Sequence, residues 1–488
     1  MTDVAAASSH SASASDSDIH LRIAGSALSS AGQVESLSDF NRWLVACGEE
    51  NYTHVEKVPL ADLERWHIEP ETGNIGHDSG KFFTVEGLDV QLPEAAVSSW
   101  TQPIINQPEV GILGILVKEF HGVLHCLMQA KVEPGNFNGV QLSPTVQATK
   151  SNYTKVHQGK SVPYLEYFRD RSRPHRVIAD VRQSEQGSWF HQKRNRNIII
   201  EVFEDVELLE GFCWLTIGQV HELLAVEDLI NMDARTVLSC LPFAGAQLPE
   251  VSGDGFRASL VRSCGEEFGS AHSTGEVLTW ITDARTRYDV DARRIPLNQV
   301  RNWCRSDELI WHESGAFFNV IGVNVKAGGR EVAQWMQPMI EPLGIGVVAV
   351  LVKRINGVLH ALMHTRVEPG YLDVIELAPT VQCTPENYDL LPSAARPPFL
   401  DEVLGADPAA IRYETVLSEE GGRFYHARNR YLVVETEREI SPEEHPDYRW
   451  LSLGQLAELL RHSHYVNIQA RSLIACMHSL WSPQTAYA

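Results

Sequence analysis

The chain of 488 residues repeats itself, and this internal duplication restricts the possible folds more than any other feature of its sequence. The stretch VKEFHGVLHCLMQAKVEPG (117–135) returns as VKRINGVLHALMHTRVEPG (352–370), and 12 of the 19 aligned positions are identical. Other stretches recur in the same order: HDSGKFFTVEGLDV as HESGAFFNVIGVNV, WTQPII as WMQPMI, SPTVQ as APTVQ, and FHQKRNRNIIIEV (190–202) as YHARNRYLVVETE (425–437) with one deletion. The two copies lie much farther apart along the chain than the repeats of a solenoid do, so the pattern predicts two homologous domains.

The repeats also place the domain boundaries. Residues 1–30 are rich in Ala, Ser and Asp, a composition that cannot bury a core, so a disordered tail is predicted there. An N-terminal repeat is expected over residues 31–243 and a C-terminal repeat over residues 274–488. Residues 244–273 between them are rich in Gly, Ser and Ala, and are interpreted as a linker that contains a short helix near FRASLVR.

Each repeat follows the order helix, strands, helix. In the first repeat, LSDFNRWLVACGEE (37–50) has apolar residues at helical spacing, and TIGQVHELLAVE (216–227) is an amphipathic helix with Thr216 as its cap. β-rich segments bounded by turn residues predict strands at residues 81–90, 111–120, 122–133 and 196–204, with a hairpin at EFHG. The predicted fold class is therefore α+β, with a mixed or antiparallel sheet flanked by helices in each repeat.

Composition excludes several classes of partner. The chain carries 41 Lys and Arg against 63 Asp and Glu, a formal net charge of −22, which argues against general binding to nucleic acid or an anionic membrane. No run of 18 apolar residues occurs, so no membrane span is expected. The eight cysteines form no CxxC pair, and we expect free thiols in a reducing cytoplasm.

The densest group of polar residues begins on the strand near residue 130. Gln129, Lys131 and Glu133 alternate with apolar residues and therefore share one strand face, as in the lining of a cavity. A solvated sheet face is the alternative. After the turn the polar residues continue with uncharged hydrogen-bonding types, which suit a polyhydroxylated ligand: Asn136, Gln141, Ser143, Thr145 and Gln147.

A second group is cationic and aromatic. In QKRNRN, Lys193, Arg194 and Arg196 precede a β-rich run and are candidates for binding a phosphate or pyrophosphate, with a solvated loop as the alternative. Trp100 is a candidate for stacking on a base, with core packing as the alternative. The chain contains no GxGxxG after a strand, GxxxxGK[ST], HExxH or GxSxG motif and no zinc spacing, so neither an organic cofactor nor a catalytic metal is expected.

Long stretches of the chain, QPEVGILGILVKEFHGVLHCLMQAKVEPGNFNGVQLSPTVQATKSNYTKVH together with WFHQKRNRN, WLTIGQ and NMDARTVLSCL, closely resemble the NDP-hexose 2,3-dehydratases of deoxysugar pathways in antibiotic biosynthesis. The resemblance implies a duplicated Nudix-like fold and a homodimer. It also implies a dTDP-4-keto-6-deoxyhexose substrate that loses its C2 hydroxyl and becomes a 3,4-diketo sugar, which a 3-ketoreductase consumes. Neither repeat carries the RExxEE-type carboxylates of a Nudix hydrolase, which argues against metal-dependent pyrophosphate cleavage.

The chemistry of such a dehydration suggests roles for individual residues. We expect Glu133 to be the base that removes the C3 proton, Tyr153 the acid or oxyanion donor, and Lys131 an electrostatic support. Alternatively, Glu133 only pairs with Lys131. The expected sugar or pyrophosphate contacts are the polar residues after the strand together with Gln129, Lys193, Arg194 and Arg196.

The second repeat keeps Glu368 but changes the residues around it. Gln129 is replaced by His364, Lys131 by Arg366 and Asn136 by Tyr371. We therefore expect the first repeat to have kept the chemistry, unless exchanged segments build one site from both repeats or both subunits. Two rival functions remain at this point: a nucleotide-sugar hydrolase, and a nucleotide-sugar binding protein without catalytic activity.

Overall fold

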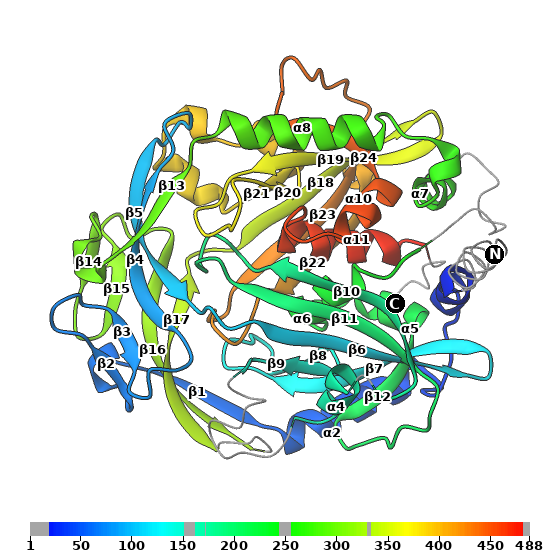
Figure 1. Ribbon diagram of the computed structural model, residues 1–488, viewed down its shortest axis with the longest axis horizontal. Coiled ribbons are helices and arrows are strands. Elements are labelled where there is room, and N and C mark those ends of the chain that lie inside the picture. The colour runs from blue at the N-terminus through cyan, green and yellow to red at the C-terminus, as the bar shows by residue number, and fades with distance from the viewer. Residues whose placement is uncertain (1–18, 151–161, 171, 244–254, 329–332, 482–488) are drawn as a thin grey trace, which may run out of the picture.

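The computed structural model of the chain describes residues 19–150, 162–170, 172–243, 255–328 and 333–481. Each repeat contains one large mixed sheet and one small antiparallel sheet, with helices packed against the large sheets (Figure 1). The predicted α+β class and the duplication are thus confirmed. The two small sheets lie together at the left of Figure 1, and the helices α6 and α11 lie between the two large sheets.

The two large sheets have the same plan. The first consists of β10 (His175–Ser184), β11 (Arg194–Val202), β6 (Gly111–Phe120), β7 (Val123–Val132) and β12 (Phe212–Thr216) in this order, with β8 (Val140–Ser143) beside β7 and β9 (Val146–Ala148) beside β6. The second consists of β22 (Ile411–Ser418), β23 (Arg428–Glu435), β18 (Gly346–Ile355), β19 (Val358–Arg366) and β24 (Tyr448–Ser452), with β20 (Glu376–Ala378) beside β19 and β21 (Val381–Cys383) beside β18. The predicted EFHG hairpin joins β6 to β7, and its His121 and Gly122 have φ angles of 51° and 82°.

The small sheets exchange strands between the repeats. The first contains β2 (Trp66–Ile68), β3 (Ile75–His77), β4 (Thr84–Gln91) and β5 (Ser99–Asn106), and the second contains β14 (Trp303–Arg305), β15 (Leu309–His312), β16 (Phe318–Ala327) and β17 (Gln334–Pro342). β1 (Thr53–Val58) of the first repeat pairs with β16, and β13 (Asp291–Ile295) of the second repeat pairs with β4. Figure 1 shows both crossings, which bind each repeat to the small sheet of the other. The exchange brings residues of both repeats to one site.

Helices cover both faces of the large sheets. They are α2 (Leu37–Glu50), α4 (Leu165–Arg169), α5 (Ile217–Leu223) and α6 (Met232–Leu238), then α7 (Phe256–Ser263), α8 (Thr274–Arg287), α9 (Leu400–Leu404), α10 (Leu453–Leu460) and α11 (Ile468–Ser479). The predicted cap Thr216 opens α5 with a capping box that includes Gln219. The largest apolar cluster joins both repeats through these helices, because it includes Val220, Ala234 and Leu473.

Two fully buried arginines cross this interface in opposite directions. Arg235 of α6 donates from Nη2 to the carbonyl of Ser418 at 2.7 Å, and Arg471 of α11 donates from Nη2 to the carbonyl of Ser184 at 2.5 Å. Each guanidinium therefore binds the last residue of the edge strand of the other repeat. Since a buried charge is stable only with such partners, this contact holds the Glu419–Glu420 segment against the first repeat.

The expected tail and linker need correction. Residues 19–27 are helical, and their Ile19 and Ile23 are buried in the main core rather than disordered. α7, which forms at the predicted FRASLVR helix, holds the equivalent place in the second repeat. Ser26 donates to the carbonyl of Leu124, as Ser263 donates to that of Leu359. Each repeat therefore begins with a packed helix, whose short Ala- and Ser-rich sequence resembles that of a tail or linker.

The cysteines and the helices bear on two further expectations. All eight cysteines lie in described residues and are free thiols, as expected. Within the described ranges, no helix is both long enough and apolar enough to cross a lipid bilayer.

Candidate functional site

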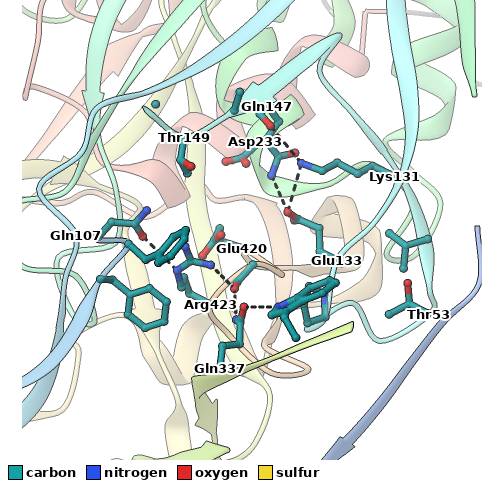
Figure 2. Close-up of a pocket in the computed structure, with 18 of the residues that line it drawn as sticks. Thr53, Gln107, Lys131, Glu133, Gln147, Thr149, Asp233, Gln337, Glu420 and Arg423 are labelled. Carbon is teal, nitrogen blue, oxygen red and sulfur yellow. Dashed lines mark hydrogen bonds and ion pairs between the residues drawn. The ribbon is translucent and has the colours of Figure 1, made fainter. Parts of the chain in front are cut away.

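A cavity of about 560 Å³ lies between the two repeats, a size typical of small-molecule sites. Its wall combines the end of β7 and part of β9 in the first repeat with Gln337, Glu420 and Arg423 of the second. Figure 2 shows Lys131, Glu133 and Gln147 pointing into the same space as Glu420 and Arg423. The alternative in which exchanged segments build one site from both repeats is therefore found within this single chain.

Glu133 stands at the centre of a hydrogen-bond chain on the first repeat's side of the cavity. Its Oε1 lies 3.5 Å from Nζ of Lys131 and accepts a 3.0 Å hydrogen bond from Nε2 of Gln147. Gln147 is itself held by Asn231, whose Nδ2 donates to Gln147 Oε1 at 3.0 Å. Strand alternation predicted that Lys131 and Glu133 share one strand face, and in the cavity Oε1 of Glu133 lies beside both the Lys131 ammonium group and the Gln147 amide.

Two other carboxyl groups of the cavity, those of Asp233 and Glu420, have pKa values raised by burial. Burial raises the pKa of Asp233 well above its ordinary value, and the neighbouring Glu185 and Glu133 raise it further. Burial also raises the pKa of Glu420 to about 8, against the pull of Arg423 and with the support of Glu133. Oδ1 of Asp233 and Oε2 of Glu420 are buried without a hydrogen-bond partner among the described residues. Glu420 therefore holds its proton near neutral pH, whereas Glu133 lies beside a cation.

Two cationic groups stand in the same cavity. Lys193 is buried, its Nζ donates to the carbonyl of Glu109, and burial lowers the pKa of its amine to about 8. Arg423 donates from Nε to Oε1 of Gln107 at 3.2 Å, and its guanidinium lies 4.3 Å from the ring centre of Phe83. A lysine and an arginine directed into one enclosed space suit an anionic ligand.

Much of the remaining wall is apolar and aromatic and comes mainly from the two small sheets. It includes Trp66, His77, Phe82, Phe83, Phe190, Trp335 and Met336. Trp66 Nε1 donates to the carbonyl of Met336 at 2.7 Å, so a contact between the repeats fixes this part of the wall. The cavity thus has an aromatic part beside a strongly charged part, which suits a ligand that carries both a flat ring and an anion.

Several of the predicted binding residues support the frame instead of lining this cavity. Thr145 Oγ1 donates to the carbonyl of Leu127 and accepts from the amide of Leu116, which ties adjacent strands together. The other side chains of this kind also bond within the protein: Ser143 to the carbonyl of Gln129, Gln141 to Ser418, Asn136 to the carbonyl of Gly139, and Trp100 to Gln102. Of the predicted polar contacts, Gln129 and Gln147 line the cavity.

The basic cluster divides between the two faces of its strand. Lys193 and Asn195 line the cavity, so alternation places Arg194 and Arg196 on the opposite face. Arg196 makes a two-pronged pair with Asp180 of the adjacent strand, at 2.7 and 2.6 Å. The expectation that Arg194 and Arg196 bind in the same site as Lys193 is therefore corrected. Tyr153, the expected acid or oxyanion donor, lies outside the described residues.

Residues that the sequence analysis missed include Glu185, Asp233, Glu420 and Arg423. The alignment of 190–202 with 425–437 was displaced by one residue, because the bridges place Phe190 beside Ile105 and Phe424 beside Ile340. When the two repeats are aligned in this register, four charged residues of the cavity correspond to neutral residues in the other repeat. The pairs are Glu420 and Gln186, Arg423 and Trp189, Lys193 and Ala427, and Asp233 and Gln469. A charge present in only one repeat was the available signal.

Comparison with known proteins agrees with this arrangement. The family model described as NDP-hexose 2,3-dehydratase matches residues 37–241 and again residues 274–477. The chain belongs to the NDP-hexose 2,3-dehydratase family. Both copies of the repeat are thus part of the family pattern. Within the described residues, no group of three or more His, Cys, Asp or Glu side chains is placed to hold a metal ion.

Three similar proteins carry the name dTDP-4-dehydro-6-deoxy-alpha-D-glucopyranose 2,3-dehydratase. The protein of Saccharopolyspora spinosa is 53% identical over 464 residues, which cover 94% of this chain and 95% of that one. The protein of Amycolatopsis orientalis is 49% identical, with 94% and 93% covered, and that of Streptomyces violaceoruber is 45% identical, with 92% and 98% covered. The similarity therefore extends over nearly the whole length of each protein.

Proposed function

We propose that this dehydratase is a lyase that converts dTDP-4-keto-6-deoxyglucose into a dTDP-3,4-diketo-2,6-dideoxyhexose. The observation that carries the proposal is the Glu133 carboxylate, held by Lys131 and Gln147 in the wall of the cavity. The names of the three similar proteins support the choice of substrate. Water is the only other product, so the reaction requires no external oxidant or reductant.

The proposed mechanism begins at C3 of the sugar. The C3 proton is acidic because it neighbours the C4 ketone, and Glu133 removes it to leave an enediolate. Nearby positive charge, here that of Lys131, stabilises the developing anion in a site shielded from water. The C2 hydroxyl then leaves as water, and the resulting enol becomes the 3,4-diketone. A base placed in this way contributes about 10²–10⁴-fold to the rate.

The two parts of the cavity suit the two parts of the substrate. We assign the thymine ring to the aromatic part around Trp66 and Phe83, and the pyrophosphate to Lys193 and Arg423. The hydroxyl groups of the sugar face Gln129 and Gln147. Tyr153 stays a prediction as an acid or oxyanion donor.

The proposal extends to the setting of the enzyme. We propose a Nudix-like fold for each repeat, a homodimer as the working form, and a 3-ketoreductase that consumes the diketone. We also propose a cytoplasmic location, which the free cysteines support. The domain boundaries proposed from the sequence shift only where the helices at residues 19–27 and 256–263 join their repeats.

The test is a coupled assay with purified protein and dTDP-4-keto-6-deoxyglucose. A 3-ketoreductase and NADPH trap the unstable diketone, and mass spectrometry detects a dTDP-2,6-dideoxy-4-keto sugar. This product must form only when the dehydratase is present. If the protein releases a nucleotide and EDTA abolishes this release, the protein is a nucleotide-sugar hydrolase instead. Tight binding of the substrate without turnover indicates a binding protein.

A further inference from the structure

We propose that Glu420, which the second repeat supplies to the cavity of the first, is the acid that protonates the C2 hydroxyl as it leaves. This inference rests on the proposed dehydration. It assigns the leaving-group step to a side chain more than 280 residues away from the base. Glu420 lies in SEEGGRF, directly after the edge strand β22.

The two carboxyl groups face one gap, and a glycine keeps that gap open. A Cβ atom added to Gly422 would collide with Oε1 of Glu420 and lie 3.6 Å from Oε1 of Glu133. A Cβ on the neighbouring Gly421 would lie 3.0 Å from Cβ of Glu133. Both groups line the same cavity, so a sugar ring in this gap can present C3 to one carboxyl group and the adjacent C2 to the other.

Their surroundings assign the base and the acid. Oε1 of Glu133 accepts a hydrogen bond from Gln147 and lies 3.5 Å from the Lys131 ammonium group, a position that suits the base. Oε2 of Glu420 is buried and has no hydrogen-bond partner in the described part of the chain. Burial and the charge of Glu133 raise the Glu420 pKa to about 8, so its proton is present at neutral pH. Two carboxyl groups in such different surroundings are a usual arrangement for a base and an acid at one centre.

The fold holds Glu420 firmly in this position. Arg235 of the first repeat donates to the carbonyl of Ser418, and the adjacent Glu419 accepts hydrogen bonds from Asn429 at 2.6 Å and from Tyr431 at 2.7 Å. The first repeat carries Gln186 at the equivalent position, where its amide donates to Glu419. An amide has no proton to give in this pH range. An acid of this kind is therefore present at only one of the two equivalent positions.

The step balances without another reactant. Glu133 takes the C3 proton, and the electrons of the C3–H bond form the enediolate with C4. Return of those electrons forms the C2–C3 double bond and breaks the C2–O bond, while Glu420 transfers its proton to the departing oxygen. Water leaves, Glu420 becomes a carboxylate, and the proton held by Glu133 restores it through solvent.

The decisive test separates proton removal from hydroxyl loss. Glu420→Gln is incubated with the substrate in D₂O, beside the wild type and Glu133→Gln. We expect Glu420→Gln to exchange the C3 hydrogen for deuterium while product formation falls about 10²–10⁴-fold, because the base remains and the acid is gone. Glu133→Gln loses both exchange and product. Wild-type turnover by Glu420→Gln, or loss of exchange together with product in a folded protein that binds substrate, overturns the assignment.

Further variants keep the test decisive. If Glu420→Gln does not fold, Gly422→Ser installs the residue that the first repeat has at position 188 and pushes the Glu420 carboxyl group aside. It is expected to show the same exchange without product. If Asp233→Asn gives this result and Glu420→Gln does not, Asp233 is the acid and the inference fails. Absence of product from the wild type refutes the proposed function itself, so the two failures are distinguishable.

Discussion

The first repeat's site and the equivalent place in the second repeat each contain the same kind of hydrogen-bond chain. In the first, Asn231 donates to Gln147, and Gln147 donates to Glu133 beside Lys131. In the second, the same chain consists of Asn467, Gln382, Glu368 and Arg366, with hydrogen bonds of 2.8, 2.9 and 3.0 Å. The duplicated frame therefore places a carboxylate and a cation alike in both.

The space around this chain differs. Tyr371, which replaces Asn136, is buried, accepts a hydrogen bond from Asn467 and packs against Gly187, where an added Cβ would lie 2.6 Å from its ring. His364 stacks on Tyr448 at 4.5 Å between ring centres. Aromatic rings thus occupy the second place, while charged groups surround the first. A duplicated frame can keep its hydrogen bonds and change its chemistry through a few side chains.

The sharpest way to break this comparison is to remove each carboxylate in turn. Glu133→Gln is expected to lower kcat about 10²–10⁴-fold, because the side chain keeps its shape and loses its basicity. The matched variant Glu368→Gln is expected to retain wild-type turnover. Steady-state kinetics in the coupled assay measures both. Equal losses in the two variants would show that both repeats contribute to catalysis.

A smaller effect is expected at Lys193, where the second repeat has Ala427. Lys193→Ala removes a buried positive charge from the cavity, and charge-assisted hydrogen bonds contribute about 1.5–3 kcal/mol. KM is therefore expected to rise about 10- to 100-fold, with a smaller change in kcat. Initial rates over a range of substrate concentrations measure the split. A fall in kcat with KM unchanged would remove Lys193 from substrate binding.

The next expected effect is on the pH dependence of kcat. The pKa of Glu420 is raised to about 8, and its protonated form is the active one, so kcat is expected to fall as pH rises through about 8. The Lys193 ammonium group lowers that pKa, so Lys193→Ala is expected to move the decline to higher pH. A kcat profile of each protein tests this. If the decline disappears in Lys193→Ala, the lysine is the group that titrates.

The smallest effect on activity is expected at Tyr371. Tyr371→Asn installs the first repeat's residue and removes a buried ring, which is expected to lower the free energy of unfolding by about 2–5 kcal/mol. Turnover at a temperature where the variant stays folded is expected to equal that of the wild type. Thermal unfolding and the coupled assay are the measurements. Lost turnover in the folded variant would mean that the ring of Tyr371 supports the active cavity.

Much of the frame was predictable from sequence because its signals are local. The helix at residues 37–50, the strands around Lys131 and the cap Thr216 all follow from periodicity and turn chemistry within a few residues. The helix at residues 19–27 was missed, since its Ala and Ser residues are buried only through packing against Leu124 and its neighbours. Arg196 was misplaced because a run of basic residues does not reveal which strand face each one occupies.

The sequence by itself determined the duplication, the α+β class and the shared face of Lys131 and Glu133, because strand alternation relates near neighbours along the chain. Only the tertiary structure decided that Glu420 and Arg423 of the second repeat complete the first repeat's cavity. That meeting depends on the exchange of β1 and β13 and on Arg235 binding the Ser418 carbonyl. These contacts join residues far apart in the chain, and their geometry is set by how whole sheets pack, which no local pattern encodes.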